Sequence, residues 1–255
     1  MKKIFLALVA GALLLCAPRS ARAAITYTGH KCYNITGGGN TAVSCTINNT
    51  GDGGGVNVFT VQWASNAPAN ADTSMSVVTA SDANGSATCI PGTRFDPSNP
   101  SIGFAFASII CYINNIASNA ADTISVNITN GSGTTFYPEI SAVSFLGQAS
   151  SSLIVNQAVN QYSGSAVAGP TTVTASGITA TFNYTSTQTV WGTAIVILKA
   201  ASGPNTAYAS GQIYGVTVSA GSGYTELLNL NHKGLDNEYG LGAVLTQIGA
   251  FIAGP

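Results

Sequence analysis

Apolar and polar residues alternate along much of this chain, and clusters of Gly, Asn and Ser interrupt the alternation. A period of two is typical of β-strands with one buried face. It is clearest in DTISVNIT (122–129), GITATFNY (177–184) and GVNVFTVQW (55–63). The clusters between such segments, among them GDGGG, DANG and SGPN, are turn sequences. No segment keeps a helical period, so the sequence predicts an all-β protein.

Two longer runs are apolar at almost every position. They are IGFAFASIICYI (102–113) and VWGTAIVILK (190–199), and both are rich in β-branched residues. Such runs are typical of central strands that are covered on both faces. Many short strands separated by frequent turns indicate a sandwich. We therefore expect a two-sheet antiparallel β-sandwich of the jelly-roll or concanavalin-like kind.

The number of domains is the next question. All-β domains reach 200–250 residues as one unit, and no Pro-rich or charged linker divides this chain. We expect a single sandwich domain over 24–255. The alternative is two immunoglobulin-like units, 24–147 and 148–255, meeting near GQASSS (147–152), because the later half has no cysteine.

The N-terminus has the features of a signal peptide. Lys2 and Lys3 precede an apolar run over 4–15, and a small-x-small cleavage pattern ends at Ala23. The run is shorter than the ~20 residues that span a bilayer. We expect residues 1–23 to be a signal peptide that looks bacterial. The mature chain would begin at Ala24, without a membrane span, and would be secreted or held at the cell surface or in the periplasm.

Cleavage of this leader would remove Cys16 and leave an even number of cysteines. Four cysteines in an exported protein indicate two disulfides, for which three pairings exist. We favour the pairs that span hairpins or neighbouring strands, Cys32–Cys45 and Cys89–Cys111. A zinc site is the competing interpretation, but no pair has the close C-x2-4-C spacing that zinc sites use.

The charge of the expected mature chain is low and negative. It keeps four basic residues against nine acidic ones, a net charge of −5. A nucleic-acid partner is excluded, since binding phosphates requires many basic side chains. Charged residues form 7% of the chain, against a usual ~25%. Because charge repulsion keeps proteins apart, this surface favours adhesion or self-association.

Four segments follow one another in an order that resembles a known group. They are CYINNIASNAADTISVNIT (111–129), EISAVSF (139–145), VSAGSGYTELL (218–228) and TQIGAFIAG (246–254). In this order the chain resembles uncharacterised secreted bacterial β-sandwich proteins that share a late Gly-Ser-Gly-Tyr-Thr turn. The resemblance implies a concanavalin-like or jelly-roll sandwich outside the cell. It implies no catalytic residue.

The chain offers little for catalysis. A hydrolytic triad needs a base beside a nucleophile, and neither His30 nor His232 lies near a G-x-S-x-G sequence. Both are interpreted as surface or loop histidines. A glycoside hydrolase needs two carboxylates beside a cleft. The carboxylates considered for that role are Glu139, Glu226, Asp236 and Glu238. We expect a protein that is not an enzyme and has no organic cofactor.

Acidic residues concentrate in TELLNLNHKGLDNEYG (225–240). The plain interpretation is a solvated loop. The functional hypothesis is that Asp236, Asn237 and Glu238 give oxygen ligands to Ca2+, which takes six to eight of them. No EF-hand spacing accompanies these residues.

Sugar-binding sites combine an aromatic surface with polar side chains. Trp63 and Trp191 lie in strand-like segments and are expected in the core, where large aromatic side chains are usually buried. Tyr224 and Tyr239 are the candidate ligand-binding residues, since both lie in turn-like segments.

Together these observations predict a secreted, non-enzymatic cell-surface or matrix protein that acts by adhesion or self-association. The alternative is a lectin-like carbohydrate-binding module, with Ca2+ as an optional ligand. The expected partners are copies of the chain itself or surface glycans.

Overall fold

The computed structural model describes residues 24–36, 41–65, 76–95, 98–99, 104–129, 136–167, 170–184, 188–214, 218–220, 225–232 and 245–252. Eighteen antiparallel strands in these ranges form four sheets, and one short 3-10 helix, η1 (Pro91–Thr93), lies between strands. The all-β antiparallel sandwich predicted from the sequence is confirmed.

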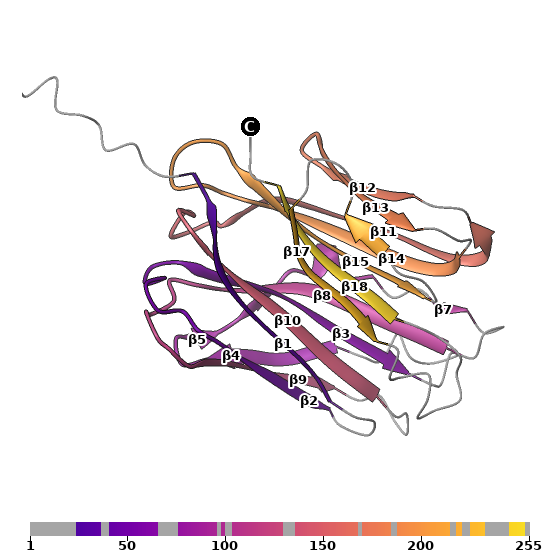
Figure 1. Ribbon diagram of the computed structural model, residues 1–255, viewed down its shortest axis with the longest axis horizontal. Coiled ribbons are helices and arrows are strands. Elements are labelled where there is room, and N and C mark those ends of the chain that lie inside the picture. The colour runs from indigo at the N-terminus through magenta and orange to yellow at the C-terminus, as the bar shows by residue number, and fades with distance from the viewer. Residues whose placement is uncertain are drawn as a thin grey trace, which may run out of the picture.

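The four sheets are stacked as layers, which are visible from bottom to top right in Figure 1. Sheet 1 contains, in spatial order, β2 (Ala42–Ile47), β9 (Asp122–Thr129), β4 (Ser76–Asp82) and β5 (Gly85–Ser86). Sheet 2 contains β1 (Thr26–Ile35), β10 (Phe136–Leu146), β3 (Val56–Ser65), β8 (Phe104–Asn114) and β6 (Thr88–Cys89), and β7 (Ser98–Asn99) also pairs with β8.

The other two layers use the later half of the chain. Sheet 3 contains β11 (Ile154–Val167), β14 (Gln188–Leu198), β15 (Thr206–Tyr214), β18 (Leu245–Ile252) and β17 (Thr225–His232). Sheet 4 contains β12 (Thr171–Ala175), β13 (Ile178–Tyr184) and β16 (Val218–Ala220).

Three apolar cores hold the layers together. Between sheets 1 and 2, Ile124 and Val126 of β9 pack against Phe59 and Val61 of β3. The core between sheets 2 and 3 includes Val56, Val58, Phe145, Val196 and Tyr208. The core between sheets 3 and 4 includes Val173, Phe182, Ile195 and Ala209. Two sheets were expected and four are present, because sheets 2 and 3 are each apolar on both faces.

The uniformly apolar runs form central strands, as predicted. Residues 107–111 of β8 and 192–198 of β14 are buried without interruption. The alternating segments DTISVNIT and GITATFNY form β9 and β13. Their buried apolar side chains are Ile124, Val126 and Ile128 in β9 and Ala180 and Phe182 in β13.

The prediction for GVNVFTVQW was wrong. We expected one wet face, but residues 56–63 of β3 are all buried. Two of the polar side chains that suggested exposure, Asn57 and Thr60, contact neighbouring layers instead. Thr60 Oγ1 hydrogen-bonds Tyr208 Oη at 2.9 Å, and Asn57 Nδ2 lies 3.4 Å from Asp122 Oδ2. Polar groups are tolerated in a core when they have hydrogen-bond partners.

The chain passes from the first pair of sheets to the second once, over 147–153. This is where the two-unit alternative divides the chain. The core between sheets 2 and 3 nevertheless contains residues from both halves. The single domain and the two-unit alternative both stay predictions.

Removing the Tyr208 hydroxyl is expected to weaken the contact between sheets 2 and 3. Tyr208→Phe leaves Thr60 without this partner, at a cost of about 1–2 kcal/mol in the free energy of unfolding. Burial raises the pKa of Tyr208 from 10.0 to about 12. Because the raised pKa belongs to the folded state, the hydroxyl contributes fully below pH 10, and its contribution is lost as the pH rises toward 12.

Urea unfolding of wild type and Tyr208→Phe at neutral pH and near pH 12 checks this expectation. The difference in stability should shrink at the higher pH. Tyr112→Phe is the control, because Tyr112 is only partly buried at the same core. Equal losses from both variants would contradict the role assigned to Tyr208.

Candidate functional site

Three loops rich in Asp and Asn meet at one end of sheets 1 and 2. They are 48–55, 83–84 and 115–121, and backbone groups tie them together. The Asn49 N–H donates to Asn119 O at 2.7 Å, and the Ala117 N–H donates to Asn84 Oδ1 at 2.7 Å. Gly51 and Gly54 have φ angles of 89° and 79°, which glycine adopts without strain.

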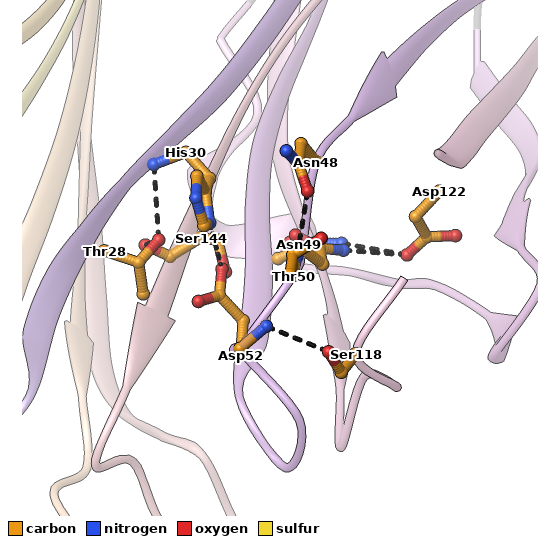
Figure 2. A network of polar contacts seen from close by, with 11 residues as sticks. Thr28, His30, Asn48, Asn49, Thr50, Asp52, Ser118, Asp122 and Ser144 are labelled. Atoms are coloured by element: carbon orange, nitrogen blue, oxygen red, sulfur yellow. Dashed lines mark hydrogen bonds and ion pairs between the residues drawn. The ribbon is translucent and has the colours of Figure 1, made fainter. Parts of the chain in front are cut away.

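Five side chains from these loops and adjoining strands form what we call the Asx cluster: Asn49, Asn57, Asp82, Asn84 and Asp122. Its centre is Asp122, the first residue of β9, which is fully buried. Asp122 Oδ2 accepts hydrogen bonds from Nδ2 of Asn49 and of Asn84, both at 2.9 Å, and more weakly from Asn57 at 3.4 Å. Figure 2 shows Asn49 directed at Asp122.

A second carboxylate lies beside the first. Asp82 Oδ1 accepts the N–H groups of Asn84 at 2.6 Å and of Gly85 at 3.1 Å, which closes the turn between β4 and β5. The Asn84 amide nitrogen that contacts Asp122 also lies 3.0 Å from Asp82 Oδ2. One NH2 group therefore bridges two carboxylates.

Burial raises the pKa of Asp122, and the neighbouring Asp82 carboxyl raises it further, while the hydrogen bond from Asn49 opposes the change. Removing a carboxylate from water disfavours its charged form, and so does a second negative charge close by. The Asx cluster thus brings a half-buried carboxyl group, that of Asp82, close to a buried one, that of Asp122, with amide groups as the hydrogen-bond donors.

A contact between a histidine and an aspartate lies on the other side of the same loop. His30 Nδ1 of β1 is 2.7 Å from Asp52 Oδ2, and Figure 2 shows the two side chains facing one another. The His30 side chain is 31% exposed, whereas Asp52 is 4% exposed. His30 was interpreted as a surface or loop histidine. Its side chain is partly exposed, but it lies in strand β1 and not in a loop, and it connects β1 to the loop 48–55.

The two predicted disulfides are confirmed, and they join the favoured pairs. Cys32–Cys45 connects β1 of sheet 2 to β2 of sheet 1. Cys89 and Cys111 are directly opposite one another on β6 and β8, within sheet 2. Both bonds therefore lie in the first pair of sheets. Disulfides of this kind are typical of proteins in oxidising compartments.

Strand β11, at the edge of sheet 3, is a second candidate functional feature beside the Asx cluster. β11 is 14 residues long, contains no Asp, Glu, Lys, Arg or His, and in the described residues pairs with β14 alone. Between its two register shifts, Asn156 to Ser163 pair regularly with β14. Val155 is 48% exposed and Val159 is 41% exposed. The other long edge strands, β1 and β17, both contain charged or titratable residues.

A shallow hollow of about 200 Å3 lies where β1 meets β2 and β9. Its lining residues are Asn34, Thr36, Ala42, Val43, Ser44, Ser125, Val126 and Asn127. Typical small-molecule pockets measure about 300–1,000 Å3 and are lined by aromatic side chains. This lining contains none, so the hollow does not favour a sugar site.

Most residues predicted to bind ligands lie outside the described ranges. This applies to Tyr224 and Tyr239, and to Asp236, Asn237 and Glu238. The glycan and Ca2+ hypotheses at these positions stay predictions. Trp63 is a core residue as expected, 1% exposed, with the Arg94 guanidinium carbon 5.8 Å from its ring centre.

The described part of the chain contains neither a group of metal-ligating side chains nor a helix that could span a membrane. In that part of the chain, no three His, Cys, Asp or Glu side chains come together as metal ligands would. Among the same residues, no helix has the length and apolar character needed to cross a membrane.

Comparison with known proteins gives no further guidance: no family model, curated protein or solved structure matches this chain. The resemblance to secreted bacterial sandwich proteins therefore stays a prediction.

The sequence interpretation missed the Asx cluster and the β11 edge. A signal for the cluster was present, because INNTGDGGG, SDANG and SNAAD each place Asp or Asn at a turn next to a strand. That these turns meet depends on the pairing of β9 with both β2 and β4. Local sequence does not reveal this pairing.

Proposed function

We propose that this chain is a secreted, non-enzymatic protein of the cell surface or extracellular matrix that acts by self-association through β11. The supporting observation is the long, uncharged edge of sheet 3 with two exposed valines. Soluble proteins usually protect sheet edges with charges, prolines or very short strands, because unpaired N–H and C=O groups recruit other strands. β11 is a long edge strand without a charged residue or a proline.

Antiparallel pairing of β11 with the β11 of a second copy gives a closed two-fold dimer. Each strand then supplies the same surface to the other, and the backbone groups of the regular stretch 156–163 pair as in any antiparallel sheet. The low charge of the chain supports this proposal, since a net charge of −5 over the expected mature chain gives weak repulsion between copies.

Lysines on β11 are expected to abolish self-association. Val155→Lys/Val159→Lys brings four positive charges together in an antiparallel dimer, so we expect the dimer Kd to rise at least about tenfold. Analytical ultracentrifugation across a concentration series measures this change. The fold should be retained, because both side chains are already exposed.

The matched control adds the same charge elsewhere. Thr123→Lys/Ser125→Lys places two lysines on the exposed side of β9, an interior strand of sheet 1. This variant should associate like wild type. A wild type that stays monomeric at millimolar concentration, or equal losses in both variants, would refute association through β11. Glycan-array binding by a monomeric wild type would instead favour the lectin-like alternative.

A further inference from the structure

The turn between β4 and β5 contains an Asn-Gly dipeptide, Asn84–Gly85. In such a dipeptide the backbone nitrogen of the glycine can attack the side-chain amide carbon of the asparagine, because glycine has no Cβ to hinder the approach. The result is deamidation, a covalent change that needs no enzyme. The sequence supplies the reactive pair, and the geometry of the turn decides when the pair reacts.

In the closed turn both reacting groups are engaged with other partners. The Gly85 N–H donates to Asp82 Oδ1 at 3.1 Å. Asn84 Oδ1 accepts the Ala117 N–H at 2.7 Å, and Asn84 Nδ2 lies 3.0 Å from Asp82 Oδ2 and 2.9 Å from Asp122 Oδ2. For the attack, Asn84 Cγ has to move onto the Gly85 nitrogen and give up these contacts. The reaction therefore requires the turn to open.

The chemical step needs only water and a base from the solvent. The Gly85 nitrogen loses its proton to the base and forms a bond to Asn84 Cγ. The bond between Cγ and Nδ2 breaks, and Nδ2 leaves as ammonia after taking a proton from the solvent. Water then opens the resulting succinimide ring. Cleavage at Cγ gives aspartate, and cleavage at the backbone carbonyl carbon gives isoaspartate.

The product changes the charge of the Asx cluster. The Asn84 NH2 group is the donor that Asp82 Oδ2 and Asp122 Oδ2 share, and deamidation replaces it with a carboxylate oxygen. Like charges close together repel one another, and burial strengthens the effect; Asp122 has 0% exposure. The isoaspartate product also lengthens the backbone by a methylene group, which disturbs the pairing of Asp82 with Gly85. The turn therefore closes less well after the reaction.

We propose that Asn84 is a self-deamidating site, that opening of the β4–β5 turn controls its reaction, and that the product weakens the closed turn. Local opening of a turn costs less free energy than global unfolding, so the reaction proceeds from folded copies of the chain. Because deamidation is irreversible, the fraction of deamidated copies measures how often this end of sheets 1 and 2 has opened. The inference does not depend on self-association through β11.

Incubation of the purified protein at mildly alkaline pH, with and without urea, tests the control by opening. Peptide mapping by mass spectrometry measures the fraction of Asn84 converted to aspartate and isoaspartate. We expect conversion at least about tenfold slower in the folded chain than in urea. Asn130–Gly131 is the internal standard in urea, where two unfolded Asn-Gly pairs should react at similar rates. No conversion of Asn84 in urea, or equal rates in folded and unfolded protein, would overturn the proposal.

A variant that loosens the turn should speed the reaction in the folded protein. Asp82→Ala removes the acceptor of the Gly85 N–H and one partner of the Asn84 amide, so we expect conversion at least about threefold faster than in wild type. Asp52→Ala is the matched control. It removes a carboxylate from loop 48–55 whose partner is His30, and it should react like wild type. Equal acceleration in both variants would show that the β4–β5 turn does not control the reaction.

The effect of the product is measured on Asn84→Asp, which supplies the aspartate form directly. We expect its Tm to fall by at least about 3 °C, because a shared donor is lost between two carboxylates. Asn48→Asp is the matched control, since Asn48 is exposed on loop 48–55 and its Oδ1 accepts the Thr50 N–H, a bond that aspartate also makes. This control should melt like wild type. An Asn84→Asp variant as stable as wild type would refute the weakening of the turn.

Discussion

Removing both disulfides is expected to lower the free energy of unfolding by about 6 kcal/mol. The bonds close loops with sequence separations of 13 and 22, and each closure is worth about 3 kcal/mol in the chain-entropy model. Natural domains are stable by only about 5–15 kcal/mol. Loss of both bonds therefore removes a large share of the stability. Unfolding should then begin in sheets 1 and 2, because both bonds lie there.

Cys32→Ala/Cys45→Ala, Cys89→Ala/Cys111→Ala and the quadruple variant separate the two contributions in urea unfolding. The first pair links sheets 1 and 2, whereas the second lies within sheet 2. Each double variant should lose about 3 kcal/mol. A quadruple variant that unfolds at the wild-type urea concentration would show that the bonds do not stabilise the fold.

Hydrogen exchange of the quadruple variant also tests how many domains the chain has. Sheets 3 and 4 contain none of the four bonded cysteines, but sheet 3 shares a core with sheet 2. If 24–255 is one domain, residues 154–252 should lose protection together with residues 26–146. If the chain forms two units, the later half should keep its protection.

The sequence predicted strands better than it predicted layers. Uniform apolar runs correctly marked β8 and β14 as central strands, because continuous apolarity leaves neither face fit for water. The alternating pattern did not predict the burial of β3, because the pattern reflects the polarity of the residues and not their exposure. Thr60 is polar and fully buried, since its partner is the Tyr208 hydroxyl from another sheet. No pattern within β3 reveals that partner.

Local sequence patterns did not predict the candidate site for the same reason. Asp82 and Asp122 are 40 positions apart in the chain and become neighbours because β4 and β9 pair. The exposure of Val159 likewise depends on sheet order, since β11 is an edge only because no strand lies beyond it among the described residues. Both features follow from long-range pairing. Sequence predicts strands from local pattern, but it does not give their order in a sheet.

Among the glycines of the described residues, Gly192 is the one where an added methyl group would come closest to a neighbouring side chain. It lies in β14 of sheet 3, and a Cβ built there would be 2.1 Å from Phe95 Cδ2 and 2.5 Å from Phe95 Cε2 and Cγ. The Phe95 ring has 0% exposure and belongs to the core between sheets 2 and 3. Because the ring cannot move into solvent, Gly192→Ala forces the two sheets apart. We expect a loss of about 3 kcal/mol or more.

A double-mutant cycle shows whether this contact is the cause. Phe95→Ala alone should cost about 3–5 kcal/mol through the cavity that it leaves. With the ring gone, Gly192→Ala should cost less than about 1 kcal/mol, so the two effects are strongly non-additive. Gly53→Ala is the matched control, since its Cβ would meet nothing closer than 3.6 Å. Additive losses in urea unfolding would show that Phe95 does not set the requirement for glycine. Non-additive losses would establish that sheets 2 and 3 are held together by an aromatic ring packed directly against bare backbone.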